Sequence, residues 1–214
     1  MTMNDGEIIL DPAAIETQSF AIIDAEVGAH TYTARQWPIV RRVIHTTADF
    51  DFARATWFSP DALETGLAAL RNGARILCDT NMVMAGVNKT RLATLGGSLS
   101  CHVADADVAA EARAQGITRS LLATRKGVAA GASIFLIGNA PTALYELLRL
   151  ARSGAVQPAL VVGVPVGFVG AQESKEALVA AGLPAIVCRG RKGGSAIAAA
   201  ILNALMILAE ESQP

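Results

Sequence analysis

Hydrophobic and polar positions divide the chain into two parts with different patterns. Up to about residue 72, apolar residues recur at the three- and four-residue spacing of amphipathic helices. This spacing predicts helices over 12–27, 33–47, 49–57 and from about 60 to 71. Asp11 is a candidate N-cap for the first helix, and Ser59-Pro60-Asp61 is typical of a helix start. The first third of the chain is therefore predicted to be mostly helical.

From residue 73 onward, short continuous apolar runs alternate with helical segments. The runs predict buried strands over 75–78, 99–103, 133–137, 160–164 and 186–188. Helices are expected near 108–115, 120–130, 142–152, 174–181 and 195–209. This alternation is typical of a parallel sheet that is buried on both sides. We expect an α/β fold, with a parallel-type sheet of about five strands and helices on both faces, preceded by the helical N-terminal third. A single domain is expected over 1–214, with a helical part at 11–72 and an α/β core at 73–209.

Composition narrows the possible partners of the chain. Hydrophobic residues make up 52% of the 214 positions and charged residues 17%, which is apolar for a monomer and favours a homo-oligomer, most simply a dimer. The net charge of −1 disfavours nucleic-acid binding. The apolar run at 196–209 is short for a membrane span and contains Asn203. The N-terminal ten residues lack the order of a secretory leader. We therefore expect a cytoplasmic protein with no nucleic-acid or membrane partner.

The cysteines and two of the histidines give no sign of a metal site. Cys78, Cys101 and Cys188 are widely spaced and fall in apolar runs, which favours buried, reduced thiols over disulfides or metal ligands. His30 lies in a polar loop and is expected to be solvated, whereas His102 is expected to make a structural polar contact. No cluster of His, Cys and carboxylate has metal-ligand spacing. No metal is predicted.

The third histidine lies in a more distinctive setting. On a helix, Arg41, Arg42 and His45 share one face, and Thr46 and Thr47 follow them near a predicted helix end. Histidine is the side chain that most readily gains or loses a proton near neutral pH, so this group suits acid–base catalysis. The same pattern also fits a structural histidine at a helix end beside two solvated arginines. The residues alone leave both interpretations open.

The loops that follow the predicted strands favour an anionic ligand. Ligands of parallel α/β sheets bind outside the carboxyl ends of the strands. In the loop 190–195, glycines, an N-cap serine, Arg191 and Lys192 together make a candidate anion site. Its spacing is not that of a nucleoside-triphosphate loop, and the glycines near residue 167 miss the dinucleotide spacing. A flat ligand bearing several carboxylates or phosphates fits better than a nucleotide cofactor.

Taken together, these segments resemble the precorrin-8X methylmutase family of cobalamin biosynthesis over about residues 15–208. The most specific matches are 42–50, 116–120, 138–144, 165–170 with 173–175, and 190–195. The resemblance implies an isomerase that moves a methyl group from C11 to C12 of the corrin ring without a dissociable cofactor. One branch of the family acts on metal-free precorrin-8X and gives hydrogenobyrinate, and the other acts on cobalt-precorrin-8 and gives cobyrinate. The run at 45–51, Trp57-Phe58-Ser59 and the loop 190–195 are more similar to the cobalt branch.

The resemblance also assigns roles to individual residues. His45 matches the family's catalytic acid, which would protonate the macrocycle, and Ser19 and Arg42 match residues that contact substrate. Gln18 stands where some members carry arginine, so this edge of the site differs from theirs. Family members are dimers with the site near the subunit contact. The candidates for binding the carboxylates around the ring are Arg119, Arg191 and Lys192, and the further substrate-binding candidates at strand ends are Thr80, Asn139 and Gly167.

Two other functions remain compatible with the residues. One is a non-catalytic corrinoid carrier of the same pathway, which would bind the tetrapyrrole without rearranging it. The other is an α/β enzyme that binds a nucleotide, for which the glycine spacings give little support.

Overall fold

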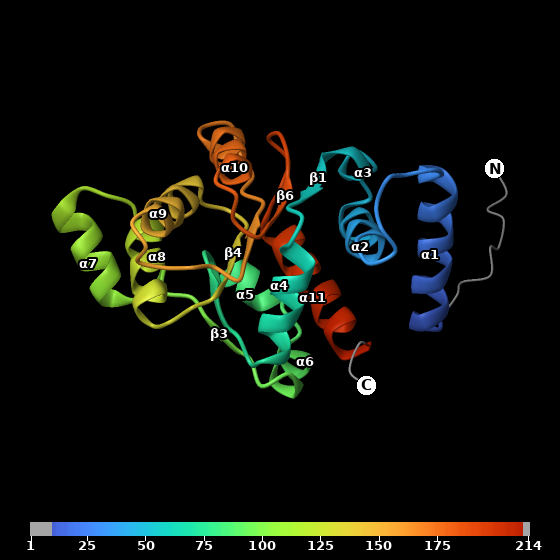
Figure 1. The fold of residues 1–214 in the computed structure, drawn as a ribbon, viewed down its shortest axis with the longest axis horizontal. Coiled ribbons are helices and arrows are strands. Elements are labelled where there is room, and N and C mark those ends of the chain that lie inside the picture. The colour runs from blue at the N-terminus through green and yellow to red at the C-terminus, as the bar shows by residue number, and fades with distance from the viewer. Residues whose placement is uncertain (1–9, 212–214) are drawn as a thin grey trace, which may run out of the picture.

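The structure is a computed structural model that describes residues 10–211 (Figure 1). Residues 1–9, which make up most of the stretch considered as a leader, and residues 212–214 lie outside the described part. The strands are β1 (Thr56–Phe58), β2 (Arg75–Cys78), β3 (Ser98–Ser100), β4 (Ile134–Ile137), β5 (Leu160–Gly163) and β6 (Ala185–Cys188). The helices are α1 (Pro12–Val27), α2 (Trp37–Thr47), α3 (Phe52–Ala55), α4 (Ala62–Arg71), α5 (Asn81–Gly86), α6 (Lys89–Thr94), α7 (Ala106–Gln115), α8 (Arg119–Ala129), α9 (Pro141–Arg152), α10 (Ala171–Ala180) and α11 (Ser195–Glu211).

The strands form one six-stranded sheet in the order β1-β6-β5-β4-β2-β3. Strands β2 to β6 are parallel, and β1 pairs with β6 in the antiparallel direction. Neighbouring side chains of β4 point to opposite faces: Ile134 belongs to the core cluster that includes α2, α4 and α11, and Phe135 to the cluster that includes α9 and α10. The predicted α/β fold, with a parallel-type sheet covered on both faces, is confirmed.

The edge strand β1 is a departure from the sequence prediction, which placed a helix over 49–57. The helix is limited to α3, and the chain then extends, with Thr56 opposite Cys188 and Phe58 opposite Ile186. Thr, Trp and Phe are β-branched or aromatic residues that pack well in a pleated strand, and pairing with β6 outweighs the helical spacing. The sheet therefore has six strands rather than about five, and one of them comes from the predicted helical part.

Several predicted boundaries shift for identifiable reasons. The helix predicted from residue 33 begins at Trp37. Residues 34–36 form a turn, in which the Gln36 N–H donates to Thr33 Oγ1 and the Thr33 N–H donates to Gln36 Oε1. Helix α4 has Asp61 at its N-cap in place of the expected Ser59. The strand predicted at 99–103 is the shorter β3. The short helices α5 and α6 were not predicted.

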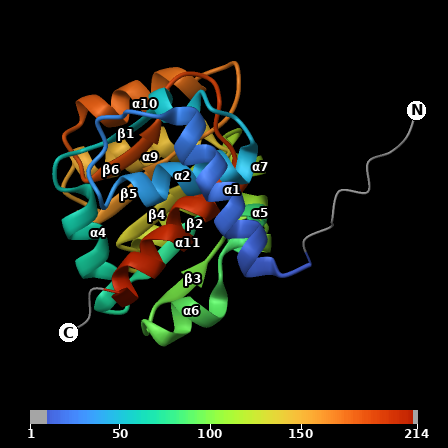
Figure 2. The same cartoon turned by 90° about the vertical axis from the view of Figure 1, so that its right-hand side faces the viewer.

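Helix α11 is the apolar run noted in the sequence, and it lies against the sheet beneath α2 and α4. Ten of its 17 residues are buried. Figure 2 shows α1 lying outermost, across α2. Within residues 10–211, no helix has both the length and the apolar character needed to cross a bilayer. All three cysteines are free thiols; Cys78 and Cys188 are buried, as predicted, whereas Cys101 is only half-buried.

Candidate functional site

A groove of about 570 Å³ lies between α1, α2 and α11 and ends at the turn between α5 and α6. It brings together two of the predicted site residues, Arg42 and His45. The lining residues are Glu16, Arg42, His45, Thr46, Gly86, Asn88, Arg91, Ala196, Ala199, Ala200, Asn203 and Ile207. The alanines of α11 leave room for a ligand beside the charged side chains of α1 and α2.

His45 lies in the last turn of α2, and its side chain is exposed in the groove. The opposite face of α2 is buried in the core, so the helix is fixed and the imidazole projects away from it. The ring meets Phe20 of α1 edge-on, with ring centroids 5.4 Å apart. The helix ends at Ala48, which adopts a left-handed conformation (φ 52°). His45 is therefore held on a rigid element and remains accessible to a substrate.

Arg42 is fixed by two contacts with α1. Its guanidinium forms an ion pair with the Glu16 carboxylate and lies over the Phe20 ring, 4.8 Å from the centroid. Arg41 makes an equivalent pair with Asp24 at 2.7 Å and also lies over Phe20. The hydrogen bond from Arg42 lowers the pKa of Glu16, and the charges of Arg42, His45 and Arg41 lower it further. Of the two arginines, Arg42 is the one that lines the groove.

Ser19, which the resemblance assigns to substrate contact, lies on α1 one turn beyond Glu16. Its hydroxyl donates to the Ile15 carbonyl at 2.8 Å, within its own helix. A hydroxyl in this position can still accept a hydrogen bond from a ligand. Ser19 is not among the residues that line the groove, and its contact with substrate stays a prediction.

Thr80 and Asn139 lie at the carboxyl ends of β2 and β4, where the loops are joined by hydrogen bonds. The buried Asp79 carboxylate accepts the N–H groups of Gly138 (3.0 Å), Asn139 (2.7 Å) and Ala140 (2.7 Å). Burial raises the pKa of Asp79, and the three N–H groups oppose that rise. Thr80 caps α5 and lies 3.2 Å from the Ser195 hydroxyl at the start of α11. The Asn139 side chain is exposed.

The loop between β6 and α11 carries two of the predicted cations in different situations. The Lys192 ammonium binds Asp49 and Asp51, each at 2.6 Å, and these carboxylates raise its pKa. The Arg191 guanidinium is exposed and lies 5.7 Å from the Phe168 ring centroid, so it is available to a ligand. The Gly167 N–H donates to the Arg191 carbonyl at 3.1 Å. The structure gives Lys192 partners within the chain that the sequence did not indicate.

A buried lysine also holds the loop between β6 and α11 in place. Lys175 of α10 is fully buried, and its ammonium donates to the Lys192 carbonyl at 2.8 Å. Burial lowers the pKa of Lys175 to about 8. Lys192 is therefore held through its backbone by α10 and through its side chain by the turn that follows α2.

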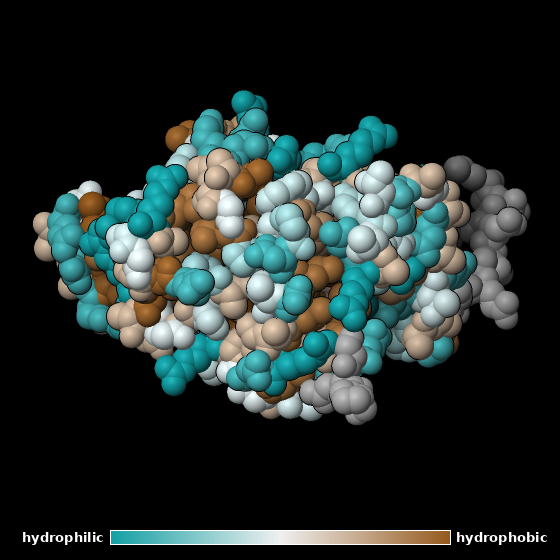
Figure 3. Space-filling model, in the orientation of Figure 1, coloured by the Kyte–Doolittle hydropathy of each residue, from teal (hydrophilic) through white to brown (hydrophobic). Residues whose placement is uncertain are grey.

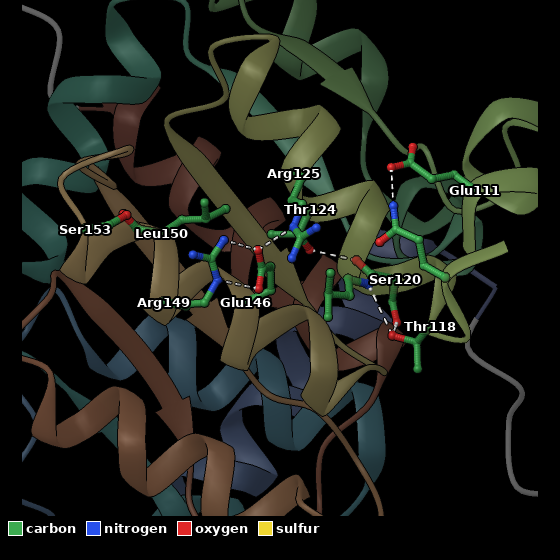
Figure 4. A network of polar contacts seen from close by, with 11 residues as sticks. Glu111, Thr118, Ser120, Thr124, Arg125, Glu146, Arg149, Leu150 and Ser153 are labelled. Atoms are coloured by element: carbon green, nitrogen blue, oxygen red, sulfur yellow. Dashed lines mark hydrogen bonds and ion pairs between the residues drawn. The ribbon is translucent and has the colours of Figure 1, made fainter. Parts of the chain in front are cut away.

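Arg119 is exposed at the start of α8 and does not line the groove. Beside it, the Thr118, Ser120 and Thr142 hydroxyls bond to one another, linking α8 to α9. Figure 4 shows the neighbouring polar network, in which two arginines point at the Glu146 carboxylate. Both arginines lower the pKa of Glu146, with Arg149 the larger cause. The structure does not bring Arg119 and His45 together within this chain.

A larger hollow, of about 890 Å³, lies near the carboxyl end of α1, and it contains none of the predicted site residues. Its lining includes Tyr32, whose hydroxyl is already bonded to the Ala53 and Thr56 carbonyls. The volume of a cavity is therefore not enough to identify the functional site in this protein. The groove at His45 is the better candidate because it combines an exposed imidazole with a guanidinium.

The sequence reasoning missed several groove residues. Glu16 lies in α1, and Arg91 is paired with Glu210 at 3.1 Å. Asn203 accepts the Asn88 N–H and donates to the Gly86 carbonyl, both at 2.9 Å. An asparagine within the apolar run of α11 was a visible signal of a polar contact on that face. Within residues 10–211, no group of three or more His, Cys, Asp or Glu could hold a metal ion.

Comparison with known sequences identifies the family. A sequence model described as CbiC, precorrin-8X methylmutase, matches residues 14–208, which include every residue of the groove. The chain belongs to the precorrin-8X methylmutase family. A solved precorrin-8X methylmutase from Thermus thermophilus is 44% identical and superimposes with a TM-score of 0.86, covering 93% of this chain and 97% of that one. The fold of this family is therefore the fold observed here.

Two curated members of the precorrin-8X methylmutase family are similar over almost their whole length. The cobalt-precorrin-8 methylmutase of Salmonella typhimurium is 47% identical, with 92% of this chain and 96% of that protein covered. The precorrin-8X methylmutase of Pseudomonas aeruginosa is 46% identical, with 93% and 97% covered. These matches confirm the predicted enzyme class, an isomerase of cobalamin biosynthesis. Overall identity does not separate the two substrate branches, because both names occur at nearly the same level.

Proposed function

We propose that the chain moves the methyl group of cobalt-precorrin-8 from C11 to C12 to give cobyrinate, with His45 as the general acid. The observation that carries this proposal is the exposed His45 imidazole in a groove that also contains Arg42, in a chain of this family. The cobalt branch is supported by the segments 45–51, 57–59 and 190–195.

The methyl shift requires only a bound substrate and a proton donor in the groove. The bond from the methyl group to C11 breaks as its bond to C12 forms, so no oxidation state changes and no redox partner is needed. A proton from His45 draws electron density toward the accepting part of the ring and lowers the barrier. General acid catalysis of this kind contributes roughly 10²–10⁴-fold. The exposed imidazole then recovers its proton as the product takes up its final conjugation.

Binding in this proposal depends on cations around an apolar ring. Arg191 is exposed at the strand ends and offers a bidentate fork to a carboxylate, whereas Arg42 lies in the groove already paired with Glu16. Lys192 and Arg119 are less direct candidates, since Lys192 is held by Asp49 and Asp51 and Arg119 does not line the groove. The contacts proposed for Ser19, Thr80, Asn139 and Gly167 rest on the family resemblance and on their positions.

A homodimer in the cytoplasm is part of the same proposal. Phe168 and Val169, in the loop that follows β5, are 84% and 90% exposed, which is unusual for large apolar side chains. Figure 3 shows further apolar patches across the middle of one face, separated by polar residues. A partner subunit that covers such surface would bring a second set of loops toward the site. Sedimentation should give a mass near twice 22.2 kDa.

The function is tested by comparing His45→Ala with wild-type protein and with His30→Ala. His30 is exposed, stacks on Trp37 and lies outside the groove, so it is a matched control. We expect His45→Ala to lower kcat by about 10²–10⁴-fold, with binding of the macrocycle retained, and His30→Ala to react normally. The readout is the absorption change in single turnover.

Cobalt-containing and metal-free substrates should be assayed side by side. A preference of the wild-type protein for the metal-free ring would overturn the choice of branch. Turnover by His45→Ala at the wild-type rate would remove the catalytic assignment, and a wild-type protein that binds without any spectral rearrangement would be a carrier.

A further inference from the structure

Two ion pairs of the same kind join α1 to α2, and they differ in one respect. Glu16 pairs with Arg42, and Asp24 pairs with Arg41, with both guanidiniums over the Phe20 ring. Only the Glu16–Arg42 pair lines the groove that contains His45. The Glu16 side chain is 46% exposed and that of Arg42 21%, so a ligand in the groove can reach both.

The charges around Glu16 fix its ionisation state. The lowered pKa of this carboxyl means that it is an anion at neutral pH. The guanidinium of Arg42 therefore already holds a carboxylate, in the position where the proposed substrate would offer one of its own. Two carboxylates on one guanidinium fork repel each other, and each reduces the hydrogen bonds available to the other.

We propose that Glu16 is a specificity-determining residue that acts as an internal substitute for a substrate carboxylate. Within the chain Glu16 binds Arg42, and substrate binding exchanges the Glu16 carboxylate for a carboxylate on the rim of the corrinoid. The inference rests on the proposed function, in which Arg42 contacts substrate. The exchange favours corrinoids with a free carboxylate at this position over corrinoids that carry an amide there.

The preference follows from the charges on each side of the exchange. A ligand carboxylate that displaces Glu16 leaves Arg42 paired, and Glu16 is solvated at the groove wall. A neutral amide gives Arg42 no counter-charge, so a ligand with an amide at this position gains little by displacing Glu16. The same competition means that Glu16 lowers the affinity of every ligand that binds Arg42 through a carboxylate, and this loss of affinity can be measured.

Glu16→Gln tests the exchange, because it removes the charge and keeps the size of the side chain. Asp24→Asn is the matched control, since it breaks the equivalent pair outside the groove. Each purified full-length variant is titrated with cobyrinate, and with cobinamide as a corrinoid that carries amides in place of those carboxylates. Thermal unfolding, measured in parallel, shows whether both variants remain folded.

Glu16→Gln should bind cobyrinate about two- to fivefold more tightly than wild type, which matches a partly exposed ion pair that no longer competes. KM for the substrate should fall by the same factor. Cobinamide binding to this variant, and binding of both ligands to Asp24→Asn, should stay within about twofold of wild type.

The opposite results overturn the inference. If Glu16→Gln binds cobyrinate no more tightly than wild type, or if its affinity rises equally for both ligands, the carboxylate exchange is excluded. If that happens while His45→Ala is inactive, the inference fails and the proposed site stands. If Glu16→Gln tightens cobyrinate binding while His45→Ala reacts normally, the exchange stands and the acid assignment fails.

Discussion

The buried ammonium of Lys175 makes a prediction that can be worked through from the structure. In the unfolded chain its pKa is near the ordinary 10.5, whereas in the folded protein burial lowers it to about 8. Between these values the unfolded chain holds a proton that the folded protein has released. Stability contributed by this residue must therefore rise with pH from about 8 to 10.5, and it is lowest below pH 8.

Lys175→Met removes this titration while keeping most of the side-chain volume. Each pH unit inside the window is worth about 1.4 kcal/mol, so protonated Lys175 costs roughly 3 kcal/mol at pH 7. Lys175→Met removes this destabilisation. It also leaves the Lys192 carbonyl without its hydrogen-bond donor, which destabilises the protein by about 1–3 kcal/mol. At pH 7 the two proteins should therefore have nearly equal free energies of unfolding.

The pH dependence separates this account from a simple packing role. From pH 7 to 9.5, the wild-type protein should gain roughly 2 kcal/mol over Lys175→Met, measured by urea unfolding at each pH. Below pH 9.5 the neighbouring Cys188 stays protonated in the folded protein, because burial raises its pKa to about 11. A difference between the two proteins that does not change with pH would refute the reasoning.

Two further substitutions test the polar networks and the helix end. Glu146→Gln should destabilise the protein by about 1–3 kcal/mol at pH 7, because the buried carboxylate loses its charge-assisted bonds to Arg125 and Arg149. Because the pKa of Glu146 is lowered in the folded protein, the difference in stability should be present above pH 4.5 and vanish as the pH falls through the lowered pKa. Chemical unfolding measured from pH 7 down to pH 3 checks this. An undiminished difference at pH 3 would contradict it. Ala48→Gly should stabilise the protein by about 0.5–1 kcal/mol, because glycine accepts the left-handed conformation that ends α2, and a lower unfolding temperature would count against it.

The sequence was most informative where local pattern and tertiary context agree. Continuous apolar runs such as 134–137 predicted the parallel strands, because a strand buried on both faces leaves little room for polar residues. The prediction was wrong at β1, where the residues Thr56 to Phe58 follow a helical turn and become a strand only by pairing with β6. That pairing joins positions more than 100 residues apart, which local spacing does not report.

Part of the candidate site could also be predicted from the spacing of residues in the sequence. Arg42 and His45 share a helix face, so their meeting in one groove followed from spacing alone. Glu16 comes from a different helix, and its position on Arg42 depends on how α1 packs. Lys192 was predicted to bind a carboxylate of the substrate, and folding also brings Asp49 and Asp51 to it from across the chain. Charge near a site is readable from sequence, whereas the pairing of those charges is a tertiary property.

Helix α1 forms one wall of the groove, and Ile23 is its only buried residue. Helix α1 packs mainly on α2, and it ends at Gly28, which adopts a positive φ. Local opening of such a weakly anchored helix requires less free energy than global unfolding. Amide hydrogens of α1 are therefore expected to exchange with solvent well before those of β4. We expect such opening to widen the groove for a large, rigid macrocycle, while the core that holds His45 stays intact.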